Sequence, residues 1–207
     1  MNFTFAITTD YSDRGRIDEV VRSIRCLLIP TYEILLIGSE PAGTNGDVRR
    51  IYFDDAANPG WITRKKNILC QEAQYENIVL MHDYYVFDRG WYESYRRFGE
   101  NWDICSNAQH LITGQRHFTD WVMWDHPVIP RYTPMDYDDW DLIRCMYISG
   151  GYYLLKKAIA LKYPLNESMG WGSAEDIEWS LRVRDHCEIV CNGSAIVRHN
   201  KRHRDAH

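Results

Sequence analysis

The sequence predicts a single α/β domain whose mostly parallel sheet is covered by helices. Its first half alternates short apolar runs with segments of helix length, which is the pattern of β-α-β units. The chain has 207 residues, 45% of them hydrophobic, enough for one buried core. No Gly-rich loop follows any expected strand, which argues against dinucleotide-binding and P-loop folds. We therefore treat residues 1–207 as one domain.

The first half is expected to form four strands and two helices. The strands are Phe3 to Thr8, Glu33 to Ile37, Val48 to Phe53 and Asn77 to Met81. The first helix, Asp13 to Leu28, has apolar residues at helical spacing and stops before Pro30. The second helix, Trp61 to Tyr75, has apolar side chains for one buried face. The order β-α-β-β-α-β is typical of a nucleotide-binding half.

The second half is less regular. Periodicity is lost between Ser106 and Tyr147, and this Trp-rich stretch is interpreted as a long functional loop that walls a binding site. Tyr147 to Lys157 is expected as a strand running into a short helix, and Ser173 to Asp185 as a helix. Glu188 to Val197 is expected to form the last strand or strands, before a basic, His-rich tail from Arg198.

Composition narrows the possible partners. The net charge is -5 with the cations scattered, so nucleic acid is not expected as a partner. The six cysteines form no C-x-x-C pair and are expected as reduced thiols. The N-terminus enters an apolar strand directly and no apolar run approaches ~18 residues, so we expect a cytoplasmic protein without a membrane span.

Polar residues gather where the expected parallel strands end. These ends are Thr8-Thr9-Asp10, Gly38-Ser39-Glu40, Asp54-Asp55 and His82-Asp83. Ligands of open α/β sheets bind at this edge, and carboxylates there suit a metal and a ribose. Asp83 after a buried strand, with His199 from a distant segment as a further ligand, suits Mn²⁺ or Mg²⁺ holding a diphosphate.

A glycine turn with two acidic residues is the most specific signal. Gly170-Trp171-Gly172 runs into a helix that starts with Glu175 and Asp176. A carboxylate at a helix start is rigidly held, as a general base must be. The alternative interpretation is an S-x-x-D capping box made by Ser173 and Asp176. Asp176 could also both cap the helix and act as the base.

Three consecutive cations begin the second helix, in the run Arg64-Lys65-Lys66-Asn67. We expect Lys66, with Asn67, to face the strand ends and contact a nucleotide. The alternative is a solvated basic face, since consecutive residues point around a helix. Aromatic residues make up 14% of the chain, which suits either the stacking of sugars or bases, with Trp124 and Trp171 as examples, or a Trp-rich core.

Together these segments resemble the GT-A glycosyltransferases, particularly the inverting enzymes of the family 2 type. The resemblance covers nearly the whole chain. It rests on the first strand with Thr8, Thr9 and Asp10, on Lys66-Asn67 in place of an Arg-Asn helix, on His82-Asp83-Tyr84 in the slot of the D-x-D motif, and on the G-W-G…E-D segment. The chain departs from the family where Gly38-Ser39-Glu40 replaces a uracil-binding Asp. Its compact length also looks like the short domains that chlorella viruses encode for capsid glycans.

The resemblance implies a mixed, mostly parallel GT-A sheet and a UDP-sugar donor half, 1–100, followed by an acceptor half, 101–207. It implies that Asp176 is the base with Glu175 beside it, and that Asp83 and His199 hold Mn²⁺ or Mg²⁺. The implied nucleotide contacts are Thr8, Thr9, Asp10, Ser39, Asp54, Lys66, Asn67 and His82, and the implied acceptor contacts are Trp171, Gly172 and Trp124. The transferred sugar would be rhamnose or a hexose, and the acceptor an oligosaccharide or glycoprotein glycan.

Three alternatives accompany this hypothesis. A retaining transferase would use the same donor residues, whereas a non-catalytic carbohydrate-binding module would keep only the aromatic residues. A sugar-nucleotide pyrophosphorylase is disfavoured because residues 8–16 contain only one glycine, Gly15. The ending at His207 also makes the chain plausible as the N-terminal part of a longer protein.

Overall fold

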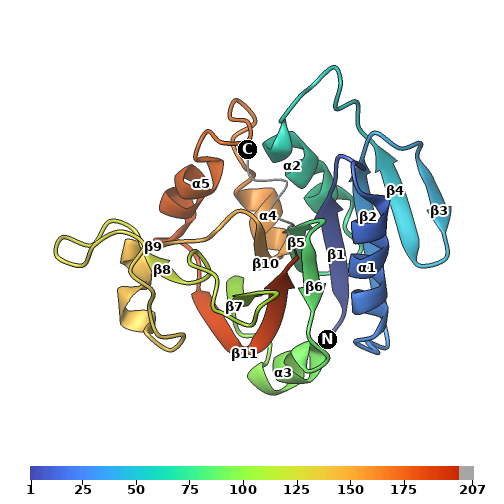
Figure 1. Ribbon diagram of the computed structural model, residues 1–207. Helices are drawn as coiled ribbons and strands as arrows, with labels where there is room; N and C mark the ends of the chain where they lie inside the picture. The colour runs from blue at the N-terminus through green and yellow to red at the C-terminus, as the bar shows by residue number, and fades with distance from the viewer. Residues whose placement is uncertain (201–207) are drawn as a thin grey trace.

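The structure, a computed structural model, describes residues 1–200 and contains one large central sheet (Figure 1). Within this range nine strands follow the order β3-β4-β2-β1-β5-β10-β7-β11-β6. They are β1 Phe3–Thr8, β2 Tyr32–Gly38, β3 Gly43–Asn45, β4 Val48–Tyr52, β5 Asn77–His82, β6 Tyr85–Phe87, β7 Ile104–Leu111, β10 Tyr152–Lys156 and β11 Ile189–His199. The basic tail from residue 201 onward lies outside the described residues.

The sheet is mixed and mostly parallel, as predicted. Strands β4, β2, β1, β5, β7 and β11 run in one direction, while β3, β10 and β6 run against them. The four strands expected in the first half are all present and pair in parallel. Strand β10 lies antiparallel between β5 and β7 and so joins the two halves into one sheet.

Helices cover both faces of the sheet because buried side chains alternate along the strands. Those of Phe3, Phe5 and Ile7 in β1 pack with helices α1 and α3, whereas Ala6 points into the opposite cluster with helices α2, α4 and α5. The helices are α1 Arg14–Arg25, α2 Ile62–Glu72, α3 Trp91–Phe98, α4 Lys157–Lys162 and α5 Glu175–Val183 (Figure 1). The two core clusters give the three-layer arrangement expected of this class.

The prediction of an irregular stretch from Ser106 to Tyr147 is wrong in part. Its first residues continue β7, and it also contains the short strands β8 Val122–Met123 and β9 Met146–Tyr147 and the 3₁₀ helix η1 Trp140–Cys145. Strands β3 and β6 and helix α3 were not predicted from the sequence. Strand β7 is hard to recognise because its buried residues include Ser106, Asn107 and Gln109.

Two further expectations concern the chain as a whole. None of the described helices is long and apolar enough to cross a membrane. All six cysteines are free thiols, in agreement with the prediction from their spacing.

Candidate functional site

A cleft of about 370 Å³ opens at the carboxyl ends of β1 and β5. Its volume lies in the usual range of small-molecule sites, roughly 300–1,000 Å³. The predicted residues that line it are Thr8, Thr9, Asp10, His82, Asp83 and Trp171. The other lining residues are Ser12, Arg16, Asp55, Gly60, Trp61, Ile62, Lys65 and Tyr84. The cleft therefore lies where the parallel strand order predicts a ligand site.

The strand wall of the cleft, defined by residues 8–10 and 82–84, is tied together by Asp83. The Thr9 hydroxyl donates to Asp83 Oδ2 at 2.6 Å, and Arg16 lies 3.4 Å from Asp83 Oδ1. Asp83 is 5% exposed. Burial raises the pKa of Asp83 above its ordinary value, while the Thr9 hydrogen bond and the Arg16 charge oppose that rise. The strand wall thus holds a carboxylate, with a cation beside it, at the floor of the cleft.

Lys65, rather than Lys66, is the lysine at the cleft. Its ammonium donates to the Thr9 carbonyl at 2.8 Å and to Asp55 Oδ1 at 2.7 Å. It also lies 5.5 Å from the centroid of the Phe53 ring. Lys65 therefore joins the end of β1 to the loop after β4 and adds a second cation to the strand wall.

Lys66 and Asn67 point away from the cleft, contrary to the expected orientation. The Lys66 ammonium is fully buried and donates to the Gly150 carbonyl at 2.7 Å. Asn67 exchanges hydrogen bonds with the Leu165 backbone, 2.9 Å in each direction. A helix turns about 100° per residue, so neighbouring lysines on α2 necessarily face different surroundings.

Trp171 also lines the cleft, and it belongs to the turn of residues 170–176, which we call the turn wall. The Trp171 N–H donates to the Gly60 carbonyl at 2.8 Å, and the Trp171 side chain remains 65% exposed at the cleft. Gly172 has a φ of +79° and Ala174 a φ of +59°, which is uncommon for a residue with a side chain. Ala174 is the N-cap of α5 without a side-chain cap, so the alternative Ser173–Asp176 capping box does not form.

Asp176 lies behind the turn and is linked to the strand wall by two glycines. Its Oδ2 accepts the Gly150 N–H at 2.9 Å, and its Oδ1 accepts the Ile177 N–H at 2.9 Å. The carbonyl of Gly151 accepts the His82 N–H at 3.0 Å. Asp176 is half-buried and Glu175 is buried, and neither lines the cleft directly.

His199 ends β11 beside the strand wall, within a group of stacked rings. Its ring centroid lies 4.6 Å from that of Tyr84 and 5.0 Å from that of His117. Tyr84 in turn stacks on His82 at 5.2 Å. The fold therefore places His199 beside Tyr84, the residue that follows Asp83, although 116 positions separate His199 from Asp83 in the sequence.

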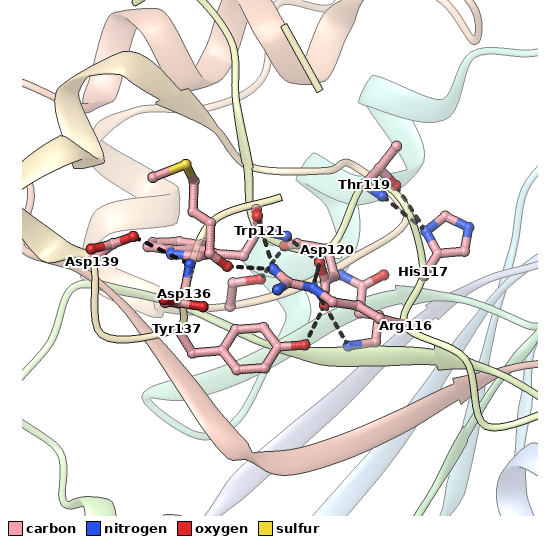
Figure 2. A network of polar contacts seen from close by, with 11 residues as sticks. Arg116, His117, Thr119, Asp120, Trp121, Asp136, Tyr137 and Asp139 are labelled. Atoms are coloured by element: carbon pink, nitrogen blue, oxygen red, sulfur yellow. Dashed lines mark hydrogen bonds and ion pairs between the residues drawn. The ribbon is translucent and has the colours of Figure 1, made fainter. Parts of the chain in front are cut away.

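The loop that carries His117 is fixed by a buried carboxylate, Asp120 (Figure 2). Asp120 accepts hydrogen bonds from Arg116 Nε at 2.8 Å and from the Tyr137 hydroxyl at 2.6 Å. The Arg116 guanidinium also donates to the Trp121 and Met135 carbonyls. This network keeps the loop between β7 and β8 against β7, and the His117 ring against His199.

The residues of the cleft fit a divalent cation that takes some of its ligands from a bound diphosphate. Mg²⁺ is usually held by one or two carboxylates together with phosphate oxygens and water. Asp83 and the neighbouring Asp10 provide carboxylates on one side of the cleft. Within residues 1–200, no three His, Cys, Asp or Glu side chains form a preformed metal site. A cation here would therefore depend on ligands from the substrate.

The remaining predicted residues lie outside the cleft lining. Ser39 donates to Asp55 at 3.0 Å, Asp54 caps the loop that follows β4, and Gly172 shapes the turn wall. Trp124 packs against Tyr147 with ring centroids 5.4 Å apart. Conversely, Arg16 and Lys65 line the cleft without having been predicted to do so, and Tyr84 was named in the His82-Asp83-Tyr84 segment without a role of its own. The strongest available signal for Lys65 was its place in the run of three cations.

The topology and the position of the cleft define the GT-A glycosyltransferase fold. The structure of GalNAc-T7 with UDP, GalNAc and Mn²⁺ aligns with 98% of this chain and 43% of its own, with a TM-score of 0.74 and 13% identity. S. aureus TarS 1-349 in complex with UDP-GlcNAc aligns with 98% of this chain and 59% of its own, with a TM-score of 0.68 and 13% identity. The chain thus spans about half the length of these structures.

Comparison of sequences does not assign the chain to a particular family within this fold. No protein-family model and no curated protein matches the chain. The descriptions of the GalNAc-T7 and TarS structures name neither a virus nor a capsid glycan, so they do not support the narrower resemblance to the chlorella-virus domains.

Proposed function

We propose that this chain is a metal-dependent glycosyltransferase that moves a sugar from a UDP-sugar to a hydroxyl of a glycan. The observation that supports the proposal most directly is the pairing of two walls around one cleft. A carboxylate with adjacent cations lies on the strand wall, and a second carboxylate, Asp176 of the turn wall, is anchored by the Gly150 N–H. Similar folds bind UDP, UDP-GlcNAc and Mn²⁺.

The strand wall would bind the donor. Thr8, Thr9, Asp10 and His82 line the cleft and would border the nucleotide and ribose, while Arg16 and Lys65 would supply positive charge near the diphosphate. Asp83, with His199 as a further ligand, would hold Mn²⁺ or Mg²⁺. When bound, the cation neutralises the charge that develops on the leaving diphosphate. Lys66, Asn67, Ser39 and Asp54 would support this wall rather than touch the nucleotide.

The turn wall would bind the acceptor and supply the base. Trp171 offers an exposed aromatic face for the apolar side of a sugar, with Gly172 setting its turn and Trp124 further back. Asp176 would remove the proton from the acceptor hydroxyl while the hydroxyl oxygen attacks the anomeric carbon of the donor sugar. The attack comes from the face opposite UDP, the bond from that carbon to the diphosphate oxygen of UDP breaks, and the configuration inverts. Glu175 would support the position of Asp176.

The first test is calorimetric titration with UDP, GDP and CMP, each with Mn²⁺ and with EDTA. We expect binding of UDP with Mn²⁺, loss of that binding with EDTA, and loss in Asp83→Ala. Binding of glycans without any binding of nucleotides would contradict the proposal and favour the carbohydrate-binding module.

The second test identifies the sugar and the stereochemistry. UDP-GlcNAc, UDP-GalNAc, UDP-glucose and UDP-rhamnose are offered with oligosaccharide acceptors, and the anomeric configuration of the product is read by NMR. A product of inverted configuration supports Asp176 as base. Retention of the anomeric configuration would leave the donor-site assignment intact but rule out the single-displacement mechanism.

A further inference from the structure

A fully buried lysine ammonium lies close to the carboxylates of α5, where the proposed function assigns it no direct part. The side chain of Lys66 is 0% exposed. Burial lowers the pKa of Lys66, and the charges of Glu175 and Asp176 oppose that change. Placing an ammonium in the interior is costly unless it is hydrogen-bonded and electrostatically compensated. The burial of Lys66 beside these carboxylates therefore indicates that its charge has a role in the structure around α5.

Gly150 stands between Lys66 and Asp176 and contacts both. The Lys66 ammonium donates to the Gly150 carbonyl at 2.7 Å, and the Gly150 N–H donates to Asp176 Oδ2 at 2.9 Å. The next residue, Gly151, accepts the His82 N–H at 3.0 Å. This short segment consequently connects the carboxylate of Asp176 to the end of β5, where the strand wall begins.

Position 150 has no room for a side chain. A Cβ there would lie 2.9 Å from Asp176 Cβ and 3.2 Å from its Oδ2. Gly150 is not among the glycines with positive φ, so space rather than backbone conformation requires a glycine. Any side chain at this position would push Asp176 away from its present place.

We propose that Lys66 and Gly150 are positioning residues for Asp176: Lys66 fixes the Gly150 carbonyl, and the Gly150 N–H fixes the carboxylate relative to the donor. The proposal rests on the proposed function, in which Asp176 is the base. The other ionisable groups facing this cluster are Glu175 on α5, Cys70 on α2, Tyr153 on β10 and Tyr147 on β9.

Two variants test the arrangement by kinetics. Gly150→Ala should lower kcat by ~10²-fold, because misplacement of a catalytic group by about 1 Å costs that much. Lys66→Met, which keeps the length of the side chain and removes the charge, should lower kcat by roughly 10-fold. In both variants the KM for the donor should stay within about twofold of wild type. Gly90→Ala is the matched control, because nothing lies within 4 Å of its added Cβ.

A double-mutant cycle separates positioning from general stability. If Lys66 acts through Asp176, Lys66→Met should cost little further activity in an Asp176→Asn background. An equal loss of kcat in both backgrounds, or a parallel loss of donor binding, would overturn the proposal. Full activity of Asp176→Asn would instead remove the base assignment on which it rests.

A measurement without turnover completes the test. In protein labelled with ¹⁵N-glycine, Lys66→Met should speed hydrogen exchange at the Gly150 amide by at least about 10-fold, with Gly90 unchanged. Unchanged exchange at Gly150 would overturn the link from Lys66 to Asp176 even if the chain transferred no sugar.

Discussion

The two walls of the cleft are held in different ways. In the strand wall, side chains contact side chains and carbonyls: Thr9 with Asp83, and Lys65 with Thr9 and Asp55. In the turn wall, backbone geometry dominates, through the Trp171 N–H, the left-handed residues Gly172 and Ala174, and Gly150 against Asp176. The difference suggests that changes in the strand wall alter binding, and changes in the turn wall alter transfer.

The largest effect is expected at Asp176. Asp176→Asn keeps the shape of the side chain, but its single amide oxygen can accept only one of the two N–H hydrogen bonds, and the amide cannot take a proton. Transfer should fall by ~10²- to 10⁴-fold, the usual contribution of a general base. Steady-state kinetics with the identified donor measures this, and calorimetry should show unchanged UDP affinity. A matching loss of UDP affinity would break the separation between the two walls.

Much of the strand wall was predictable, because it depends on pattern. The runs Phe3 to Thr8 and Asn77 to Met81 are apolar and buried almost throughout, and parallel strands place their ends together. Thr9, Asp10, His82 and Asp83 follow directly from those ends. Lys65 lines the cleft in place of the expected Lys66, a difference of one residue, because the rotation of a helix against a sheet depends on tertiary packing.

The later part of the sheet was less predictable. In β7, Asn107 and Gln109 are buried because tyrosine hydroxyls bind them: Tyr95 and Tyr152 lie 3.1 and 2.7 Å from Asn107 Oδ1, and Tyr85 lies 3.0 Å from Gln109 Oε1. A hydrophobic pattern cannot show that polar residues are satisfied by partners distant in sequence. The Gly150 contact with Asp176 is invisible in the sequence for the same reason.

A smaller effect is expected at Lys65. Lys65→Met removes the hydrogen bonds to Thr9 and Asp55 together with a charge in the cleft. UDP affinity should fall by about 10-fold, because the proposed contact of the Lys65 charge with the diphosphate is lost, and one hydrogen bond of a charged group contributes about that much. The value of kcat at saturating donor should change little. Calorimetry and kinetics test both points, and Arg64→Met, whose side chain pairs with Glu167, is the control.

Backbone strain in the turn wall can be relieved at Ala174. Ala174→Gly should stabilise the protein by about 1 kcal/mol, because a left-handed conformation is costly for a residue with a Cβ. The Tm should rise by about 2–4 °C in thermal unfolding. The looser turn should lower kcat while UDP affinity is kept. Leu28→Gly is the control, because Leu28 also has a positive φ, +55°, but is 83% exposed after the end of α1 and does not line the cleft. It should raise the Tm without lowering kcat.

The smallest effect is expected at Asp47, which belongs to neither wall. The hydrogen bond from Arg25, helped by that from Tyr32, lowers the pKa of Asp47 from 3.8 to about 2. A lowered pKa stabilises the folded chain fully above the unfolded value, and that contribution is lost as pH falls from about 4 toward 2.

Asp47→Asn should therefore lower the free energy of unfolding by less than about 1 kcal/mol at pH 7, as expected for a surface pair. The difference from wild type should shrink below pH 4 in urea titrations, while UDP affinity and kcat at pH 7 stay unchanged. A change in either functional value would show that the sheet edge is coupled to the cleft, and that the two walls are not the only elements that separate binding from transfer.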